Sequence, residues 1–210
     1  MNEWLKEQRK NAAPFVKAFY KPLPYLQSKI DEANKTSKTC LAMHIRRTKN
    51  DEANIDLNIY MNYATAFMEA GGKRIYLSTD SESVYPKIKS SWPSKIHKRI
   101  IRNKRSKLSS TEQHISEQSN HHQSNMDALV DIYAMAKCDF ILHGQSSISE
   151  ATIYVKPELQ DRSVNFALPP EERMDLETFK KEVKSFLKKA KSNKKSKEKN
   201  VSAESLRKRR

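Results

Sequence analysis

The chain alternates between short apolar runs and longer segments in which apolar residues recur at helical spacing. The runs contain few polar interruptions, which is typical of strands that are buried on both faces. They predict strands at 40–43, 74–80, 95–102 and 139–144. Helical spacing predicts helices at 56–70, 81–89 and 125–138, and a last one from about residue 172. This alternation predicts an α/β fold with a Rossmann-like, mostly parallel sheet and flanking helices.

Residues 1–38 are predicted to form a helical lead-in to this pattern. Helical spacing covers 3–20, where Pro14 is expected to break the helix, and a second short helix is expected at roughly 22–34. Several aromatic residues of the lead-in need an apolar surface to pack against: Trp4, Phe15, Phe19 and Tyr25. That surface is either the sheet of this domain or a preceding domain that the sequence does not contain.

The length of 210 residues suits one sizeable domain, which we place at 39–190. The net charge of +15 suggests a nucleic-acid partner. However, residues 180–210 hold 14 Lys or Arg against 3 Glu, which is +11 of that charge and leaves only +4 for the rest. Nucleic acid is therefore not the expected partner of the domain. Residues 191–210 indicate a disordered basic tail, with a nuclear address, a polyanion-binding arm and a membrane-surface contact as functional alternatives.

Several kinds of site are excluded by the sequence. Neither a GxGxxG pattern nor a Walker loop occurs, and no DxD pair is present to hold a diphosphate through a metal. Three histidines of the long polar segment 103–124 lack Cys or Glu at ligand spacing, so no metal site is expected: His114, His121 and His122. No apolar run is long enough to span a membrane. Cys40 and Cys138 show neither CxxC spacing nor a disulfide framework.

The strongest candidate for chemistry is TCLAMHIRRTKND, residues 39–51. Its apolar half predicts a buried strand, and its polar half brings His44, Arg46 and Arg47 to the carboxyl end of that strand. Ligands bind at this edge of open α/β sheets, and two adjacent arginines favour an anion, with phosphate as the first choice. The alternative is a solvated loop, because charged residues are common on surfaces.

Three further places carry weaker signals. Asp80 ends the second strand, where it either contacts a ligand or caps the next helix. Asp127 and Asp131 share one helix face, as exposed charges or as acceptors for a guanine edge. The segment HGQSSIS, residues 143–149, turns from a strand into a helix, where free N–H groups either cradle a phosphate or are simply capped by serine.

Three of these motifs, HIRRT, RIYLSTD and DIYAMAKCDFILHGQSS, occur in an order and spacing that resembles the carboxyl-terminal half of α-1,6-fucosyltransferases. These enzymes are related to the bacterial nodulation fucosyltransferases. The resemblance covers roughly residues 15–168. It implies the donor-binding half of a two-domain GT-B glycosyltransferase and a first GT-B domain outside this sequence. It further implies inverting, metal-independent transfer of fucose from GDP-fucose to an N-glycan core in the Golgi lumen.

The resemblance also implies roles for individual residues. His44 and Asp131 would hold the guanosine part of the donor, and Arg46 would bind the β-phosphate with Arg47 beside it. The other implied contacts are with the diphosphate, by Ser146 and Ser147, and with the fucose or acceptor side, by Asp80 and Tyr60.

The chain departs from the family where the catalytic base is needed. Lys49, Asn50 and Ile148 replace the family's Asp, Lys and Gln, and the loop after HIRRT is shorter. Asp51 is the nearest candidate for the general base, with Glu52 beside it. Two functions follow as hypotheses. The chain is a fucosyltransferase-like enzyme, or it is a non-catalytic domain that binds nucleotide, or polyanions through its basic tail.

Overall fold

The computed structural model describes residues 3–35, 39–47, 55–103 and 117–207, and it shows a five-stranded sheet. The strands are β1 (Cys40–Ile45), β2 (Arg74–Thr79), β3 (Ile100–Ile101), β4 (Phe140–His143) and β5 (Ser163–Asn165). Their order is β3-β2-β1-β4-β5, and every neighbouring pair is parallel. The predicted α/β, Rossmann-like fold with a parallel sheet is confirmed.

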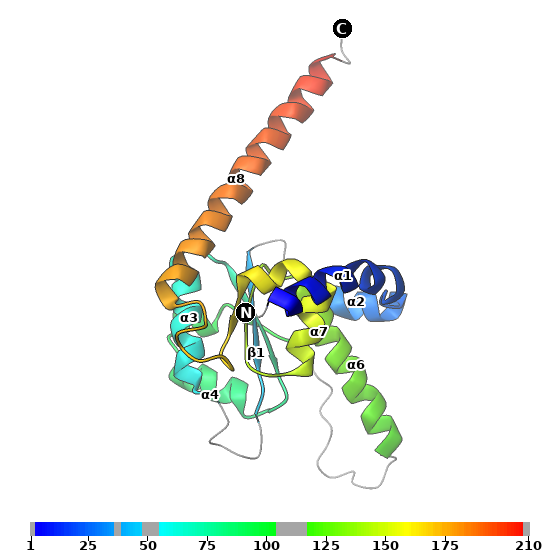
Figure 1. The fold of residues 1–210 in the computed structure, drawn as a ribbon, viewed down its shortest axis with the longest axis vertical. Helices are drawn as coiled ribbons and strands as arrows, with labels where there is room; N and C mark the ends of the chain where they lie inside the picture. Colours follow the sequence, from blue (N-terminus) through cyan, green and yellow to red (C-terminus); the bar gives the residue numbers. More distant parts are fainter. Residues whose placement is uncertain (1–2, 36–38, 48–54, 104–116, 208–210) are drawn as a thin grey trace.

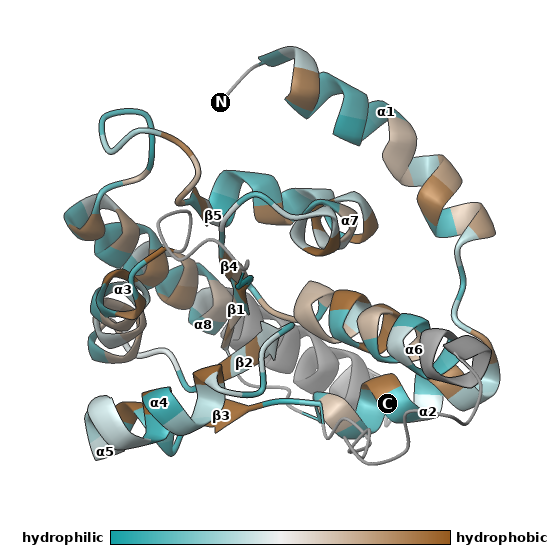
Figure 2. Cartoon of the chain, turned by 90° about the horizontal axis from the view of Figure 1, so that it is seen from below, coloured by the Kyte–Doolittle hydropathy of each residue, from teal (hydrophilic) through white to brown (hydrophobic). Residues whose placement is uncertain are grey.

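Helices cover both faces of this sheet (Figures 1 and 2). One layer contains α3 (Leu57–Glu69), α4 (Val84–Ser91), α5 (Ser94–His97) and the start of α8 (Leu176–Arg207). The other contains α2 (Pro24–Ala33), α6 (Glu117–Ala136) and α7 (Ser147–Val155), with α1 (Glu3–Phe19) and the 3-10 helix η2 (Pro157–Arg162) against α7. All six residues of β1 are buried, because alternate side chains enter the two cores on either side of the sheet.

The helix α3 begins and ends where the sequence predicted. The Asp56 side chain accepts a hydrogen bond from the backbone N–H of Asn58 and so caps the first turn. At the other end Gly71 has a φ of 106°, a conformation that glycine adopts without steric cost. The chain can therefore turn directly into β2.

The prediction of a strand at 95–102 was mostly wrong. Residues 94–97 form the short helix α5, and only Ile100 and Ile101 pair with β2. Pro93 precedes this helix at a φ of −54°, close to the helical value, and Ile96 is buried beneath it. The helical turn that starts after Pro93 thus outweighed the strand preference of the β-branched residues in this segment.

The break expected at Pro14 is also absent, because α1 continues through this residue to Phe19. A proline inside a helix leaves one carbonyl without its N–H partner, here that of Lys10. Lys10 is exposed, so water can satisfy that carbonyl. The lead-in therefore contains one long helix followed by α2.

The last helix is longer than expected. Its first turns pack on the sheet through Phe179 and Val183, which are fully buried. Beyond them the helix extends away from the body of the molecule as far as Arg207 (Figure 1). Residues 191–207 are thus helical, within the tail 191–210 that the sequence predicted to be disordered, and 208–210 lie outside the described residues.

A disulfide that the sequence did not predict joins Cys40 to Cys138. Cys40 begins β1, and Cys138 lies two residues before β4, the neighbouring strand. Strand pairing brings their Cα atoms to 4.6 Å although 98 residues separate them in the sequence. The bond therefore links the start of β1 to the turn that leads into β4.

Candidate functional site

A cleft of about 1020 Å³ opens at the carboxyl ends of β1, β4 and β5. In the order β3-β2-β1-β4-β5 the chain first adds β2 and then β3 on one side of β1. It then crosses to the other side of β1 and adds β4 and β5 there. The cleft thus lies by the topological switch point of the sheet, which is the usual ligand site of such folds. Its walls are formed by Arg46, Ile55, Tyr60, His143, Gly144, Gln145, Ser146, Ser147, Ser149, Glu150, Asn165, Phe166 and Ala167.

The amino-terminal turn of α7 forms one wall of the cleft. Ser146 caps this helix, because its hydroxyl accepts a hydrogen bond from the backbone N–H of Ile148 at 3.2 Å. Ser147 follows as the first helical residue and is exposed. A Cβ on Gly144 would lie 2.6 Å from the Ile55 side chain, so glycine permits this close approach of strand and loop. Because Ser146 and Ser147 begin α7 and line the cleft, the positive end of the helix dipole faces the cleft.

Of the two predicted arginines, only Arg46 reaches the cleft. It follows β1 directly, is exposed, and lies in the wall of the same cleft as Ser146 and Ser147. Arg47 instead holds the loop, since its guanidinium donates to the Ile55 carbonyl at 3.1 Å. Its backbone N–H donates to Asp80 at 2.8 Å, so Asp80 orders the turn after β1 and does not line the cleft.

Behind the α7 wall, five side chains form a chain of hydrogen bonds between the sheet and α6. The hydroxyls of Tyr76 and Ser78 donate to the two carboxylate oxygens of Asp131, at 2.8 and 2.9 Å. Ser78 Oγ also contacts His44 Nδ1 at 3.3 Å, and His44 Nε2 contacts Ser146 Oγ at 2.9 Å. All except Ser146 are buried.

The direction of these bonds determines how His44 carries its proton. A hydroxyl has one hydrogen, and Ser78 gives its own to Asp131, so His44 Nδ1 must donate to Ser78. At a pH where the ring is neutral, Nε2 is then an acceptor for the hydroxyl proton of Ser146. Asp131 is thus engaged on both oxygens, and the predicted roles of His44 and Asp131 toward guanosine stay predictions.

We expect the Ser78→Ala variant to lose this tautomer of His44. Without the Ser78 oxygen, Nδ1 loses the acceptor that β2 provides, and the tautomer with the proton on Nε2 gains population. Long-range ¹H–¹⁵N correlation spectra at pH 8, assigned with His44→Gln, should show Nδ1–H in the wild type and in Ser78→Thr but not in Ser78→Ala. A wild-type ring protonated at Nε2, or an unchanged tautomer in Ser78→Ala, would contradict this interpretation.

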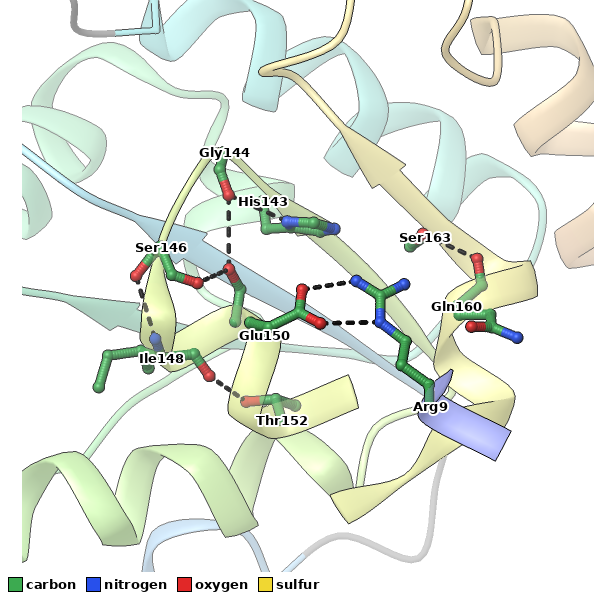
Figure 3. Close-up of polar contacts among 10 residues, drawn as sticks. Arg9, His143, Gly144, Ser146, Ile148, Glu150, Thr152, Gln160 and Ser163 are labelled. Carbon is green, nitrogen blue, oxygen red and sulfur yellow. Dashed lines mark hydrogen bonds and ion pairs between the residues drawn. The ribbon is translucent and has the colours of Figure 1, made fainter. Parts of the chain in front are cut away.

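A second polar cluster joins α1 to the wall of the cleft (Figure 3). The buried guanidinium of Arg9 makes two bonds to the carboxylate of Glu150, at 2.8 and 2.5 Å. Nearby, His143 Nδ1 donates to the Gly144 carbonyl at 3.0 Å, since a carbonyl can only accept. Burial lowers the pKa of His143 below its ordinary value, so the ring is neutral near pH 7. Its Nε2 is a buried acceptor without a partner among the described residues.

The remaining predicted site residues differ in position. Tyr60 lies in the wall of the cleft and donates from its hydroxyl to the His44 carbonyl at 3.2 Å. Burial raises the pKa of Tyr60, so the phenol stays protonated. Asp51, the predicted base, lies outside the described residues. Within the described residues, Glu150 is the one carboxylate in the wall, and it is paired with Arg9.

The sequence missed several residues of this site. Asn165 ends β5, and Phe166 and Ala167 directly follow it; the three residues of this strand are too few to show a periodic pattern. Arg9 and Glu150 are 141 positions apart, so only the fold brings them together. Among the described residues, no group of three or more His, Cys, Asp or Glu side chains is arranged to hold a metal ion. None of the helices in the described part is long and apolar enough to cross a membrane.

No family model and no curated protein matches the chain, but solved structures do. Fucosyltransferase NodZ from Bradyrhizobium aligns at 17% identity and a TM-score of 0.44, over 68% of this chain and 44% of that one. NodZ alpha-1,6-fucosyltransferase soaked with GDP-fucose aligns at 17% identity and a TM-score of 0.46, over 70% of this chain and 46% of that one. The chain spans less than half the length of these structures. The second of these is an alpha-1,6-fucosyltransferase, the kind of enzyme that the sequence motifs resemble.

Proposed function

We propose that this chain is the donor-binding half of a glycosyltransferase that takes fucose from GDP-fucose. One observation carries the proposal. Arg46 and the amino-terminal turn of α7 lie in the walls of one cleft, at the switch point of the sheet. An arginine and a helix amino terminus are two of the strongest phosphate-binding groups in proteins. The ordered motifs HIRRT and HGQSS supply both.

The same two groups suit a transfer that needs no metal. When the bond between fucose and the β-phosphate breaks, negative charge develops on the departing diphosphate. A fixed guanidinium and a helix end stabilise that charge without reorganisation, which is the largest single contribution in many enzymes. Arg46 would hold the β-phosphate, and Ser147 with the first N–H groups of α7 would meet the diphosphate from the opposite side. Tyr60 would face the sugar.

The acceptor side of the reaction rests on the resemblance alone. Inverting transfer needs a base to take the proton of the acceptor hydroxyl, and the proposal assigns this role to Asp51. An N-glycan core as acceptor and the Golgi lumen as location are parts of the same proposal. The Cys40–Cys138 disulfide supports an oxidising compartment, because such bonds are rare in the cytosol.

Calorimetric titration tests donor binding without any acceptor. We expect GDP to bind with micromolar affinity, and GMP to bind at least about tenfold more weakly, because it lacks the β-phosphate that Arg46 would hold. UDP serves as the control for the base. Equal affinity for GDP and GMP, or no GDP binding at all, would contradict the proposal.

The alternative function is a non-catalytic domain that binds polyanions, and one observation favours it. Residues 180–210 carry a charge of +11, and most of them lie in α8, which extends away from the body of the molecule (Figure 1). Titration with single-stranded DNA at several salt concentrations distinguishes the two functions. Strong salt dependence without affinity for GDP would favour the alternative.

A further inference from the structure

The carboxylate of Glu150 lies beside the place where an anionic ligand would bind. Glu150 belongs to the first turn of α7 and lines the cleft together with Ser146 and Ser147. Ser147 and Glu150 are three residues apart, so their side chains share one face of the helix. A carboxylate in the first turn of a helix offsets part of the positive charge at that helix end. An unpaired Glu150 would therefore weaken the binding of a diphosphate at the same turn.

Arg9 of α1 neutralises this carboxylate from outside the cleft. Its guanidinium donates to the two carboxylate oxygens of Glu150, from Nε at 2.8 Å and from Nη2 at 2.5 Å. The Arg9 side chain is only 4% exposed, whereas that of Glu150 is 38% exposed. Of the two, only Glu150 lines the cleft. Figure 3 shows Arg9 extending from α1 to Glu150 of α7.

The charge of the cleft depends on this pair. Among the described residues that line the cleft, Arg46 and Glu150 are the charged ones, so their charges alone would cancel. His143 of β4 lies near both members of the pair, but burial lowers its pKa below the ordinary value and the ring is neutral near pH 7. Arg9 is therefore the group that offsets Glu150 and leaves the charge of Arg46 available to an anion.

We propose that Arg9 is a positioning residue of the donor cleft and acts on a bound diphosphate through Glu150. It removes a negative charge from the first turn of α7 and fixes the carboxylate that carries this charge. The helix α1 thereby contributes to the binding site, although none of its described residues lines the cleft. The identity of the ligand rests on the proposed function, whereas the effect of Arg9 on the charge of the cleft can be measured without any ligand.

A thiol introduced at the first helical position of α7 reports this charge directly. Both natural cysteines are joined in the disulfide, so the Ser147→Cys variant has a single free thiol. The thiolate form of a cysteine is stabilised at a helix amino terminus and disfavoured by a neighbouring carboxylate. The rate of alkylation by iodoacetamide, measured as a function of pH, gives the pKa of the introduced thiol.

In the Ser147→Cys background, Arg9→Met should raise the pKa of this thiol by about one pH unit, because Glu150 then stays charged without its partner. Arg9→Met/Glu150→Gln should return the pKa close to the starting value, since both charges are then absent. A purely structural role of Arg9 predicts no such recovery, because the double variant also lacks the ion pair between α1 and α7. Lys10→Met removes one exposed cation from the same helix and is the matched control, which should leave the pKa unchanged.

Titration with GDP, with Ser147 intact, tests the consequence for binding. Arg9→Met should weaken GDP binding about tenfold, and Arg9→Met/Glu150→Gln should bind within about threefold of the wild type. Lys10→Met should bind as the wild type does, and circular dichroism checks that each variant folds.

The two measurements separate this proposal from the proposed function. A thiol pKa that Arg9→Met leaves unchanged, or one that stays raised in the double variant, would overturn the role of Arg9 even if GDP binds. The expected thiol pKa values together with a wild type that does not bind GDP would support the effect of Arg9 on the cleft and contradict the proposed function.

Discussion

The Arg46→Ala variant should lose about 10²–10³ in the rate of GDP-fucose turnover, the usual cost of removing one fixed donor to a developing negative charge. Arg46 is the one arginine among the described residues in the wall of the cleft, which the amino-terminal turn of α7 also lines. Its loss leaves the β-phosphate with the helix end alone. Release of GDP from GDP-fucose is the readout, and the affinity for GDP should fall with it.

Two further variants make this result specific. Arg46→Lys keeps the charge but loses the two-pronged geometry, so its activity should lie between that of the wild type and Arg46→Ala. Arg102 is exposed and stacks on Tyr85 away from the cleft, so Arg102→Ala should behave as the wild type. Near-normal turnover by Arg46→Ala would contradict the assignment of the donor site.

The second large effect concerns stability. The Cys40→Ala variant should lose about 3–5 kcal/mol of unfolding free energy, because the 98-residue separation makes the disulfide a long-range restraint on the unfolded chain. Urea denaturation followed by circular dichroism measures the difference. A loss of this size is a large part of the stability of a typical domain.

Chemical reduction provides the control for this prediction. A reducing agent should destabilise the wild type by nearly the same amount and should leave Cys40→Ala almost unchanged. Cys138→Ala and the double variant should match Cys40→Ala, because all three remove the same bond. A wild type whose unfolding is indifferent to the reducing agent would show that the bond does not form in solution.

Much of the fold could be predicted from the sequence, because the central strands are apolar on both faces. β1, β2 and β4 are all read directly from such runs. β3 was misjudged because Pro93 starts a helical turn inside an apparently extended segment. β5 was missed because a three-residue strand shows no period, and its pairing with β4 is a long-range event.

The candidate site was predictable only in part, for a related reason. Arg46 directly follows β1, and Ser146 lies three residues after the end of β4, so both could be placed at the carboxyl edge that parallel strands share. Ser78 gave no signal, because a serine near the end of a strand is ordinary until its partners are known. The links from Ser78 to Asp131 and from Arg9 to Glu150 span 53 and 141 positions. Spacing along the chain could not reveal them.

The central claim is that the cleft between Arg46 and α7 binds a nucleoside diphosphate. The most direct measurement is a titration of the ¹⁵N-labelled chain with GDP, followed by the backbone amide shifts. We expect the largest shifts at Arg46, at residues 144–148, and at 165–167, where β5 ends, with little change along α8. Absence of shifts at 144–148, or shifts confined to α8, would contradict the claim.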